Sequence, residues 1–250
     1  MSGGIHSVPS AIVLVPDMPV ASYDITLHRF VLCQYSEAVA VALACSGLNF
    51  STAVYSAATF EQAKSVSPSG QLPLLTWGDT LLTESRDIIR HIASHTPQVG
   101  LSSESAPLTD EFLTELGVLV EWLVAEDEHT RAAFARHFND GEPSRQFEDL
   151  VLAHSRSNAE RHGISDWPPS ERMSRLLELL QELGTHTSAT PWLGGERPNM
   201  ADCIAGASLR TLINVGKLEQ NTSHIAAVLY REPRVMDWLQ RLDAVVESAA

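Results

Sequence analysis

The sequence predicts an α/β domain followed by an all-helical domain. Strand and helix signals alternate between residues 24 and 94, in the order strand, helix, strand, helix, strand, strand, helix. A segment rich in Pro, Gly and Ser follows at 96–107, and no strand signal appears after it. We therefore divide the chain into an N-terminal extension (1–22), an α/β domain (23–96), a linker (97–107) and a helical domain (108–250).

The first strand and helix of the α/β domain are predicted from two different patterns. In residues 24–30, Ile25 and Leu27 alternate with polar residues, which is the period of a half-buried strand. Residues 38–44 are all apolar and rich in Ala, and Gly47 lies just beyond them. Such a run predicts a buried helix that ends at a glycine.

The next two elements are a strand and a short helix, predicted from the β-rich residues 49–55 and from residues 59–65. Because the domain begins strand, helix, strand, we expect its first two strands to be parallel and joined by a right-handed crossover.

Two further strands and a helix complete the α/β domain. Residues 72–77 and 80–82 are predicted to pair antiparallel across a two-residue turn, Gly78-Asp79. A helix over residues 84–94 would bury its three isoleucines, Ile88, Ile89 and Ile92.

The helical domain is predicted from apolar residues at helical spacing. Asn199 followed by Asp202 is a close relative of the capping box and marks the start of one helix. The expected helices span 108–138, 144–163, 170–183, about 200–215, and 224–249 with a break near Pro233.

The composition excludes several classes of function. The chain has 250 residues, with 17 Lys and Arg against 31 Asp and Glu, so its formal charge is −14. That charge argues against binding to nucleic acid or an anionic membrane. No apolar run of membrane-spanning length and no secretory signal are recognised, and three widely spaced cysteines suggest no disulfide framework. We expect a cytoplasmic protein in a reducing compartment.

Cys33 is the residue that suggests chemistry, because it lies between the first strand and the first helix. The unpaired N–H groups and the dipole of a helix start favour an anion, so the sequence predicts a thiolate there. A thiolate attacks disulfides and electrophilic carbon. The alternative is that Cys33 is a small core residue.

Four motifs in order make the chain resemble the cytosolic glutathione S-transferase family. The resemblance spans about residues 24 to 245 and implies a thioredoxin-like N-terminal domain (βαβαββα), a helical C-terminal domain, glutathione as co-substrate and a homodimer. The motifs are C-Q-Y-S at 33–36, S-G-Q-L-P-L-L at 69–75, L-T-E-S-R-D-I at 82–88, and W-L-G-G at 192–195 with P-N-M-A-D at 198–202.

The resemblance also implies how glutathione is held. Gln71, Leu72 and Pro73 match a loop with a cis-proline, whose backbone pairs with an extended peptide as an added strand. Glu84 would accept from the α-amino group, and Ser85 at a helix start would bind the γ-glutamyl carboxylate. The alternatives are a trans turn proline at 73, and a helix whose first residues are only a cap.

Cys33 falls where omega, lambda and dehydroascorbate-reductase classes carry their active cysteine. That implies a thioltransferase or reductase acting on a small electrophile or disulfide, with Cys33 as nucleophile. Two other functions stay open: conjugation or isomerisation of a hydrophobic metabolite, and a non-catalytic binding or regulatory role. The chain departs from the pattern at Gln34, where those classes have proline.

Other residues carry weaker signals. Lys64 and Arg90 are the candidates for the glycine carboxylate of glutathione. No metal site is expected, because His91 and His95 lack the zinc-protease motif. Cys45 and Cys203 are predicted to be core thiols. Trp122 is expected to pack in the interior or to wall an apolar pocket between the domains.

Overall fold

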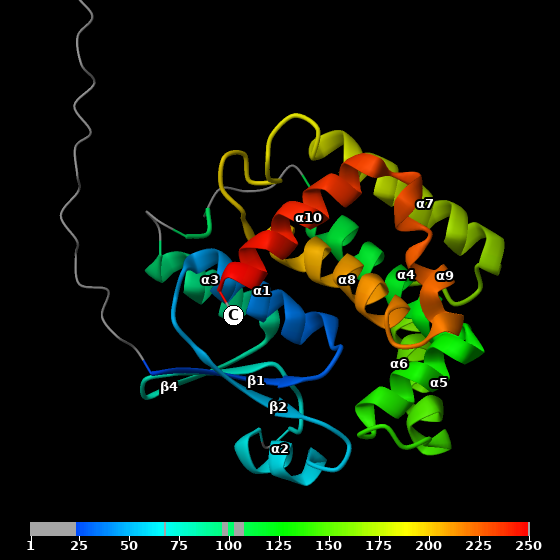
Figure 1. Cartoon of the computed structure of the whole chain (residues 1–250), viewed down its shortest axis with the longest axis horizontal. Coiled ribbons are helices and arrows are strands. Elements are labelled where there is room, and N and C mark those ends of the chain that lie inside the picture. Colours follow the sequence, from blue (N-terminus) through cyan, green and yellow to red (C-terminus); the bar gives the residue numbers. More distant parts are fainter. Residues whose placement is uncertain (1–23, 68, 97–99, 103–107, 250) are drawn as a thin grey trace, which may run out of the picture.

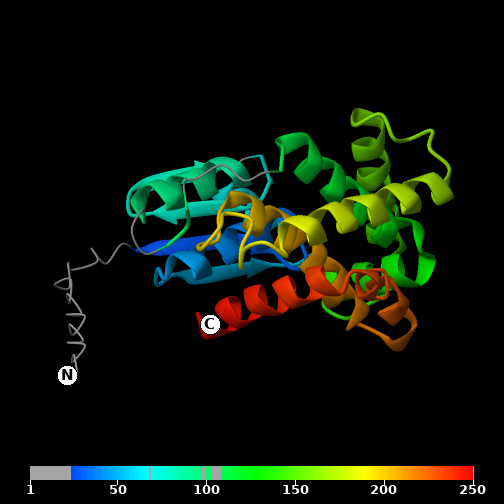
Figure 2. The ribbon, with the colours of Figure 1, turned by 90° about the horizontal axis from the view of Figure 1, so that it is seen from above.

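The computed structural model describes residues 24–67, 69–96, 100–102 and 108–249. The predicted extension at 1–22 lies outside these residues, as does most of the predicted linker. In the described part, a four-stranded α/β unit lies beside a helical unit, as Figures 1 and 2 show.

The sheet has the strand order β2-β1-β3-β4. Strand β1 (Ile25–Phe30) is parallel to β2 (Ser51–Tyr55) and antiparallel to β3 (Leu74–Trp77), which in turn is antiparallel to β4 (Thr80–Thr83). Parallel pairing of the first two strands and the hairpin at Gly78-Asp79 are therefore confirmed. The thioredoxin-like order βαβαββα is complete with α1 (Gln34–Ser46), α2 (Phe60–Val66) and α3 (Ser85–His95).

Helix α1 is buried along its length, because it lies between the sheet and the helical unit. Residues 38–44 are all buried, and Gly47 ends the helix with a φ of 68°. Helices α1 and α3 cover one face of the sheet and α2 covers the other (Figure 1). The predicted inner face of α3, with Ile88, Ile89 and Ile92, is fully buried.

The helical unit differs from the prediction at one point. The expected helix over 108–138 is two helices, α4 (Asp110–Glu126) and α5 (Glu128–Phe138). Asp127 ends the first in an extended conformation and caps the second, since its side chain accepts a hydrogen bond from the backbone N–H of Thr130 at 2.8 Å.

The remaining helices follow the predicted boundaries to within a few residues. Helix α8 begins with a complete capping box between Asn199 and Asp202, as predicted. The helices and short 3₁₀ turns are α6 (Arg145–Arg161), α7 (Pro169–His186), α8 (Met200–Gly216), η1 (Gln220–Thr222), α9 (Ser223–Ala226), η2 (Leu229–Arg231) and α10 (Pro233–Ser248).

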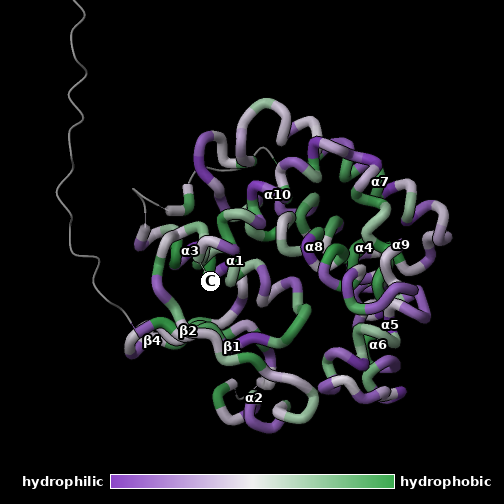
Figure 3. Tube along the Cα trace, in the orientation of Figure 1, coloured by the Kyte–Doolittle hydropathy of each residue, from purple (hydrophilic) through white to green (hydrophobic). Residues whose placement is uncertain are grey.

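The two units share a hydrophobic core around α1. Cys203 and Ala207 of α8 and Leu242 of α10 pack into the cluster that also holds β1, α1 and α3. Gly206 permits this approach, since a Cβ there would collide with a methyl carbon of Leu242. Figure 3 shows hydrophobic positions along the sheet and on the central helices. None of the described helices combines the length and the apolarity needed to cross a membrane.

Candidate active site

The strand register brings three predicted site segments to one end of the sheet. Leu74 pairs with His28 near the end of β1 and with Thr83 at the end of β4. The loop before Leu74 therefore lies between the chain that leaves β1 toward Cys33 and the chain that leaves β4 toward Ser85. Three segments that are far apart in sequence therefore lie at the same end of the sheet: Cys33, residues 71–73, and the Glu84-Ser85 pair.

Cys33 is the residue that precedes the first turn of α1. Its backbone is extended, its carbonyl accepts the hydrogen bond of Glu37 N at 2.8 Å, and its side chain is half-buried. The Ser36 hydroxyl and the backbone N–H groups of Tyr35 and Ser36 lie close enough to the sulfur to lower its pKa. The placement of Cys33 at the helix start agrees with the sequence analysis.

The surroundings of Cys33 act against the predicted thiolate. Burial raises the pKa of the Cys33 thiol above its ordinary value, and the Glu121 carboxylate acts in the same direction. The donors at the start of α1 oppose these two effects and do not overcome them. Desolvation and a nearby negative charge therefore both disfavour a thiolate at Cys33.

A large apolar cavity opens beside Cys33, at the junction of the two units. Its volume is about 650 Å³. Helices α2, α4, α5 and α6 and the segment from Phe30 to Tyr35 form its walls, and five phenylalanines line it: Phe30, Phe60, Phe134, Phe138 and Phe147. A cavity of this size and lining suits an apolar or aromatic small molecule.

The polar part of this cavity was not found by sequence analysis. Glu121 of α4 accepts hydrogen bonds from Gln34 of α1 and Asn158 of α6, each at 2.6 Å. A signal was present, since Glu121 interrupts an apolar run between Val120 and Trp122. Its partners could not be predicted, because they lie 87 and 37 residues away in sequence.

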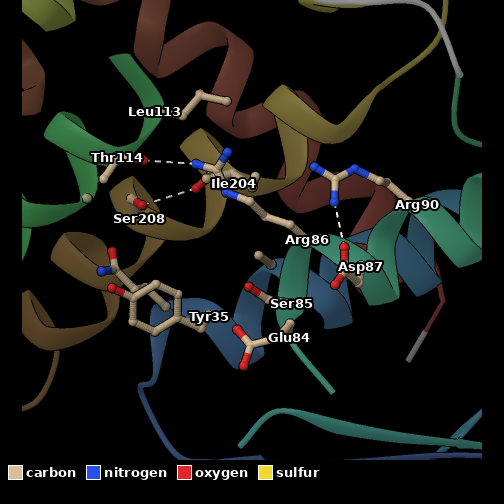
Figure 4. A pocket seen from close by; sticks show the side chains of 13 residues that line it. Tyr35, Glu84, Ser85, Arg86, Asp87, Arg90, Leu113, Thr114, Ile204 and Ser208 are labelled. Atoms are coloured by element: carbon tan, nitrogen blue, oxygen red, sulfur yellow. Dashed lines mark hydrogen bonds and ion pairs between the residues drawn. The ribbon is translucent and has the colours of Figure 1, made fainter. Parts of the chain in front are cut away.

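A second cavity, of about 360 Å³, lies between α1, α3, α4 and α8. Glu84 and Ser85 line it together with Tyr35, and Figure 4 shows these three side chains in the cavity, with Glu84 and Ser85 at the start of α3. Arg86 reaches across to α4, where it donates to Thr114 at 3.0 Å (Figure 4). It also pairs with Asp110 of the same helix.

The start of α3 leaves donors open in this second cavity. Glu84 precedes the first turn with a φ of 64° and makes no side-chain cap. Since the first N–H groups of a helix have no partner within the helix, those that begin at Ser85 are available to an anion.

The loop at 71–73 contains the predicted cis bond, between Leu72 and Pro73. A hydrogen bond fixes the start of this loop, because Ser67 Oγ donates to the Gln71 carbonyl at 2.8 Å. Pro73 is buried, Leu72 is half-buried and Gln71 is exposed. The three residues line neither of the two cavities. They lie between Cys33 and Ser85, and we refer to residues 71–73 as the cis-Pro73 ledge.

The two candidate cations for the glycine carboxylate lie in different places. Lys64 pairs with Glu61 and lies against Phe60, next to Gly70 of the loop that precedes the cis bond. Arg90 lines the second cavity and pairs with Asp87. Lys64 is therefore the candidate near the ledge, and Arg90 lies on the side of Ser85.

Three other expectations can be compared with the structure. Trp122 is buried, as expected of a packing residue. It lines a separate pocket with Trp167 and Arg172, so the alternative role as a wall of the interdomain cavity is wrong. Cys203 is a buried core thiol as predicted, and the half-buried Cys45 packs against the same cluster. No group of three or more potential metal ligands occurs among the described residues.

Comparison with known proteins agrees with this geometry. Residues 27–100 match the family model described as "Glutathione S-transferase, N-terminal domain". The matched segment covers nearly the whole α/β unit. No curated protein is similar enough in sequence to be counted as a relative.

Solved structures extend the likeness to the helical unit. Glutathione S-transferase III in its apo form is 22% identical, with a TM-score of 0.52 over 90% of this chain and 95% of its own. Glutathione S-transferase I bound to lactoylglutathione is 19% identical, with a TM-score of 0.53 over 91% and 98%. A family member from Pseudomonas fluorescens Pf-5 with two glutathione molecules bound is 19% identical, with a TM-score of 0.51 over 94% of each chain. The whole chain therefore has the glutathione transferase fold.

Proposed function

We propose that this chain is a glutathione-dependent transferase that acts on an apolar electrophile. The observation that carries the proposal is the position of the large apolar cavity. It opens beside Cys33, at the end of the sheet where the cis-Pro73 ledge and Ser85 also lie. One end of a glutathione transferase domain thus offers a ledge for a peptide and a cavity for an apolar partner.

Glutathione would lie along the ledge as a short added strand. The backbone of Leu72 would pair with the cysteinyl residue of glutathione, and Gln71 would flank it. The first N–H groups of α3 and the Ser85 hydroxyl would bind the γ-glutamyl carboxylate, while Glu84 would accept from the α-amino group. Lys64 is placed to meet the glycine carboxylate.

This placement brings the sulfur of glutathione to the start of α1. The backbone N–H of Tyr35, the Ser36 hydroxyl and the protonated Cys33 thiol would donate hydrogen bonds to it and stabilise its anion. The thiolate attacks an electrophilic carbon in the apolar cavity, so that a carbon–sulfur bond forms and the leaving group departs with its electron pair. The thiol proton passes to solvent.

A second candidate function keeps Cys33 as the nucleophile, as the sequence predicts. The three donors around its sulfur favour this candidate, since they would stabilise a Cys33 thiolate once it forms. The thiolate would attack a glutathionyl disulfide to give a Cys33–glutathione disulfide and release the substrate thiol. A second glutathione would then reduce Cys33 and leave as oxidised glutathione.

Replacing Cys33 separates the two functions. We expect Cys33→Ser to conjugate glutathione to 1-chloro-2,4-dinitrobenzene within about tenfold of the wild-type rate, because a hydroxyl still donates to the thiolate. Cys33→Ala should lose a larger part of the conjugation rate than Cys33→Ser, because a methyl group donates no hydrogen bond. Steady-state absorbance kinetics measure both rates.

The opposite outcome supports the second candidate. If Cys33→Ser abolishes turnover, and intact mass with peptide mapping finds glutathione on Cys33 after treatment with oxidised glutathione, then Cys33 is the nucleophile. A chain that binds no glutathione, does not conjugate 1-chloro-2,4-dinitrobenzene and forms no adduct on Cys33 would instead have a non-catalytic role. The predicted homodimer is a separate question, which light scattering during gel filtration would answer.

A further inference from the structure

The apolar cavity beside Cys33 contains one carboxylate that is neither exposed nor neutralised by a cation. Glu121 projects from α4, and its side chain is 17% exposed. The other acidic residue of the lining, Glu61, is 82% exposed and pairs with Lys64 at 2.7 Å. Among the described residues that line the cavity there is no lysine or arginine, and His154 is the only histidine.

Two buried amides fix the Glu121 carboxylate in place. Gln34 Nε2 donates to one carboxylate oxygen and Asn158 Nδ2 to the other, both at 2.6 Å. Gln34 is 7% and Asn158 is 3% exposed. Because amides are uncharged, they orient the carboxylate without cancelling its charge, and lone pairs remain on its oxygens for other donors, one of which is the Tyr35 hydroxyl.

The nearest cationic candidate does not neutralise this charge. His154 Nε2 lies 4.0 Å from Glu121 and 3.2 Å from the amide nitrogen of Asn158. The amide nitrogen of Asn158 can only donate, so His154 Nε2 accepts a hydrogen bond from it in this geometry. The lining therefore carries a net negative charge next to the start of α1.

The influence of this charge extends to the reacting end of the cavity. Besides raising the pKa of Cys33, the Glu121 carboxylate helps burial to raise the pKa of Tyr35. A group that disfavours an anion on both side chains will also disfavour an anionic group in the apolar part of the cavity, away from the donors at the start of α1, since the surroundings there are apolar and screen poorly.

We propose that Glu121 sets the charge preference of this cavity, which accepts neutral or cationic aromatic compounds and rejects those bearing a carboxylate or sulfonate. The proposal rests on the proposed function in taking this cavity as the site of the second substrate. A compound with an N–H or ammonium group gains the open lone pairs of Glu121. An anion instead loses hydration beside a fixed negative charge.

A purely mechanical role for Glu121 predicts something different. If the residue only joins α1 to α6 through Gln34 and Asn158, its replacement will change stability and leave the preference among ligands unchanged. Selectivity between matched ligands is therefore the decisive measurement.

The experiment uses two fluorescent probes that share one aromatic frame. N-phenyl-1-naphthylamine is neutral, and 8-anilinonaphthalene-1-sulfonate adds a sulfonate. We expect the wild-type protein to bind the neutral probe more tightly. In Glu121→Gln the sulfonate probe should gain about tenfold in affinity, while the neutral probe should change by less than about twofold.

Two further variants keep the test sharp. Glu126→Gln removes the same charge from the same helix, but Glu126 lines the separate pocket of Trp122 and should leave both affinities unchanged. Glu121→Asp keeps the charge and should keep the preference, even though its hydrogen bonds are altered. Circular dichroism shows whether each variant is folded.

Three results would overturn the proposal: equal affinities in the wild type, an unchanged ratio in Glu121→Gln, or the same gain in Glu126→Gln. Failure of the wild type to bind either probe would also overturn it. Probe binding requires neither glutathione nor turnover. A protein that shows the preference but conjugates nothing would contradict the proposed function and leave this inference intact.

Discussion

At the scale of single residues, the chemistry of Cys33 is a balance between opposed effects. Its position at the start of α1 supplies the donors that stabilise a thiolate, and this is the part that sequence reveals. Desolvation in the folded chain and the Glu121 carboxylate act against the thiolate, and they prevail. A cysteine at a helix start is therefore not necessarily a reactive one.

The pH dependence of Cys33 alkylation tests this balance. Only the thiolate reacts with iodoacetamide, and a raised pKa means less thiolate at any given pH. We expect the rate at Cys33 to keep rising with pH through about pH 8.5, the ordinary pKa of a free thiol. Peptide mass spectrometry after timed quenching follows Cys33 separately from Cys45.

A matched variant gives the control for this profile. Glu121→Gln removes a charge that disfavours the thiolate, so its profile should shift to lower pH, whereas Glu126→Gln should leave the profile in place. A wild-type profile that is already level at neutral pH would show that the thiol is ionised and would restore Cys33 as the nucleophile.

At the scale of single elements, the start of α8 depends on one buried carboxylate. Asp202 is fully buried and accepts from the backbone N–H groups of Leu193, Gly194 and Asn199 at 2.9, 3.2 and 2.9 Å. It also accepts from Trp238 Nε1 at 2.9 Å. One side chain thus joins the 192–195 turn, the cap of α8 and the α10 helix.

Removing this carboxylate should destabilise the protein strongly. We expect Asp202→Ala to lower the free energy of unfolding by about 3 kcal/mol or more, because four donors lose their acceptor and three of them are backbone groups. Asp202→Asn keeps one oxygen acceptor and should cost less. Urea denaturation followed by circular dichroism measures both changes.

The control is an aspartate with no such role. Asp237 lies exposed on α10, so Asp237→Ala should change the free energy of unfolding by less than about 0.5 kcal/mol. Equal losses at 202 and 237 would mean that the cap of α8 contributes nothing specific.

Much of the fold follows from local sequence, and particular residues show why. Alternation at Ile25 and Leu27 predicts β1, and the Ala-rich run with Gly47 predicts both the burial and the end of α1. These signals lie within short stretches of sequence, so they can be recognised without knowledge of the long-range contacts. The break at Asp127 was missed because the polar residues 126–129 could equally form the exposed face of one continuous helix, although an Asp three residues before Thr130 is itself a cap signal.

The site was predicted less completely than the fold, because part of it depends on long-range packing. The positions of Cys33, the cis-Pro73 bond and Ser85 followed from motifs. The charge of Cys33 did not, since it depends on burial and on Glu121 from another helix. No local sequence pattern predicts that α1, α4 and α6 contact one another through Glu121.

At the scale of the whole molecule, α1 connects the peptide ledge to the apolar cavity. One side of α1 faces the sheet and α3, and the other packs against α8 and α10 through a shared core. Gln34, in its first turn, lines both cavities and donates to Glu121 of the helical unit. The site is therefore assembled by both units. The proposed function depends on glutathione binding between Leu72 and Ser85.

Isothermal titration of the full chain with glutathione tests this claim most directly. We predict one glutathione bound per chain, with affinity reduced about tenfold in Ser85→Ala, because a hydroxyl that donates to the γ-glutamyl carboxylate is lost. Ser94→Ala, at the other end of α3, should bind as the wild type does. No heat of binding at millimolar glutathione, or equal affinities in all three proteins, would contradict the account.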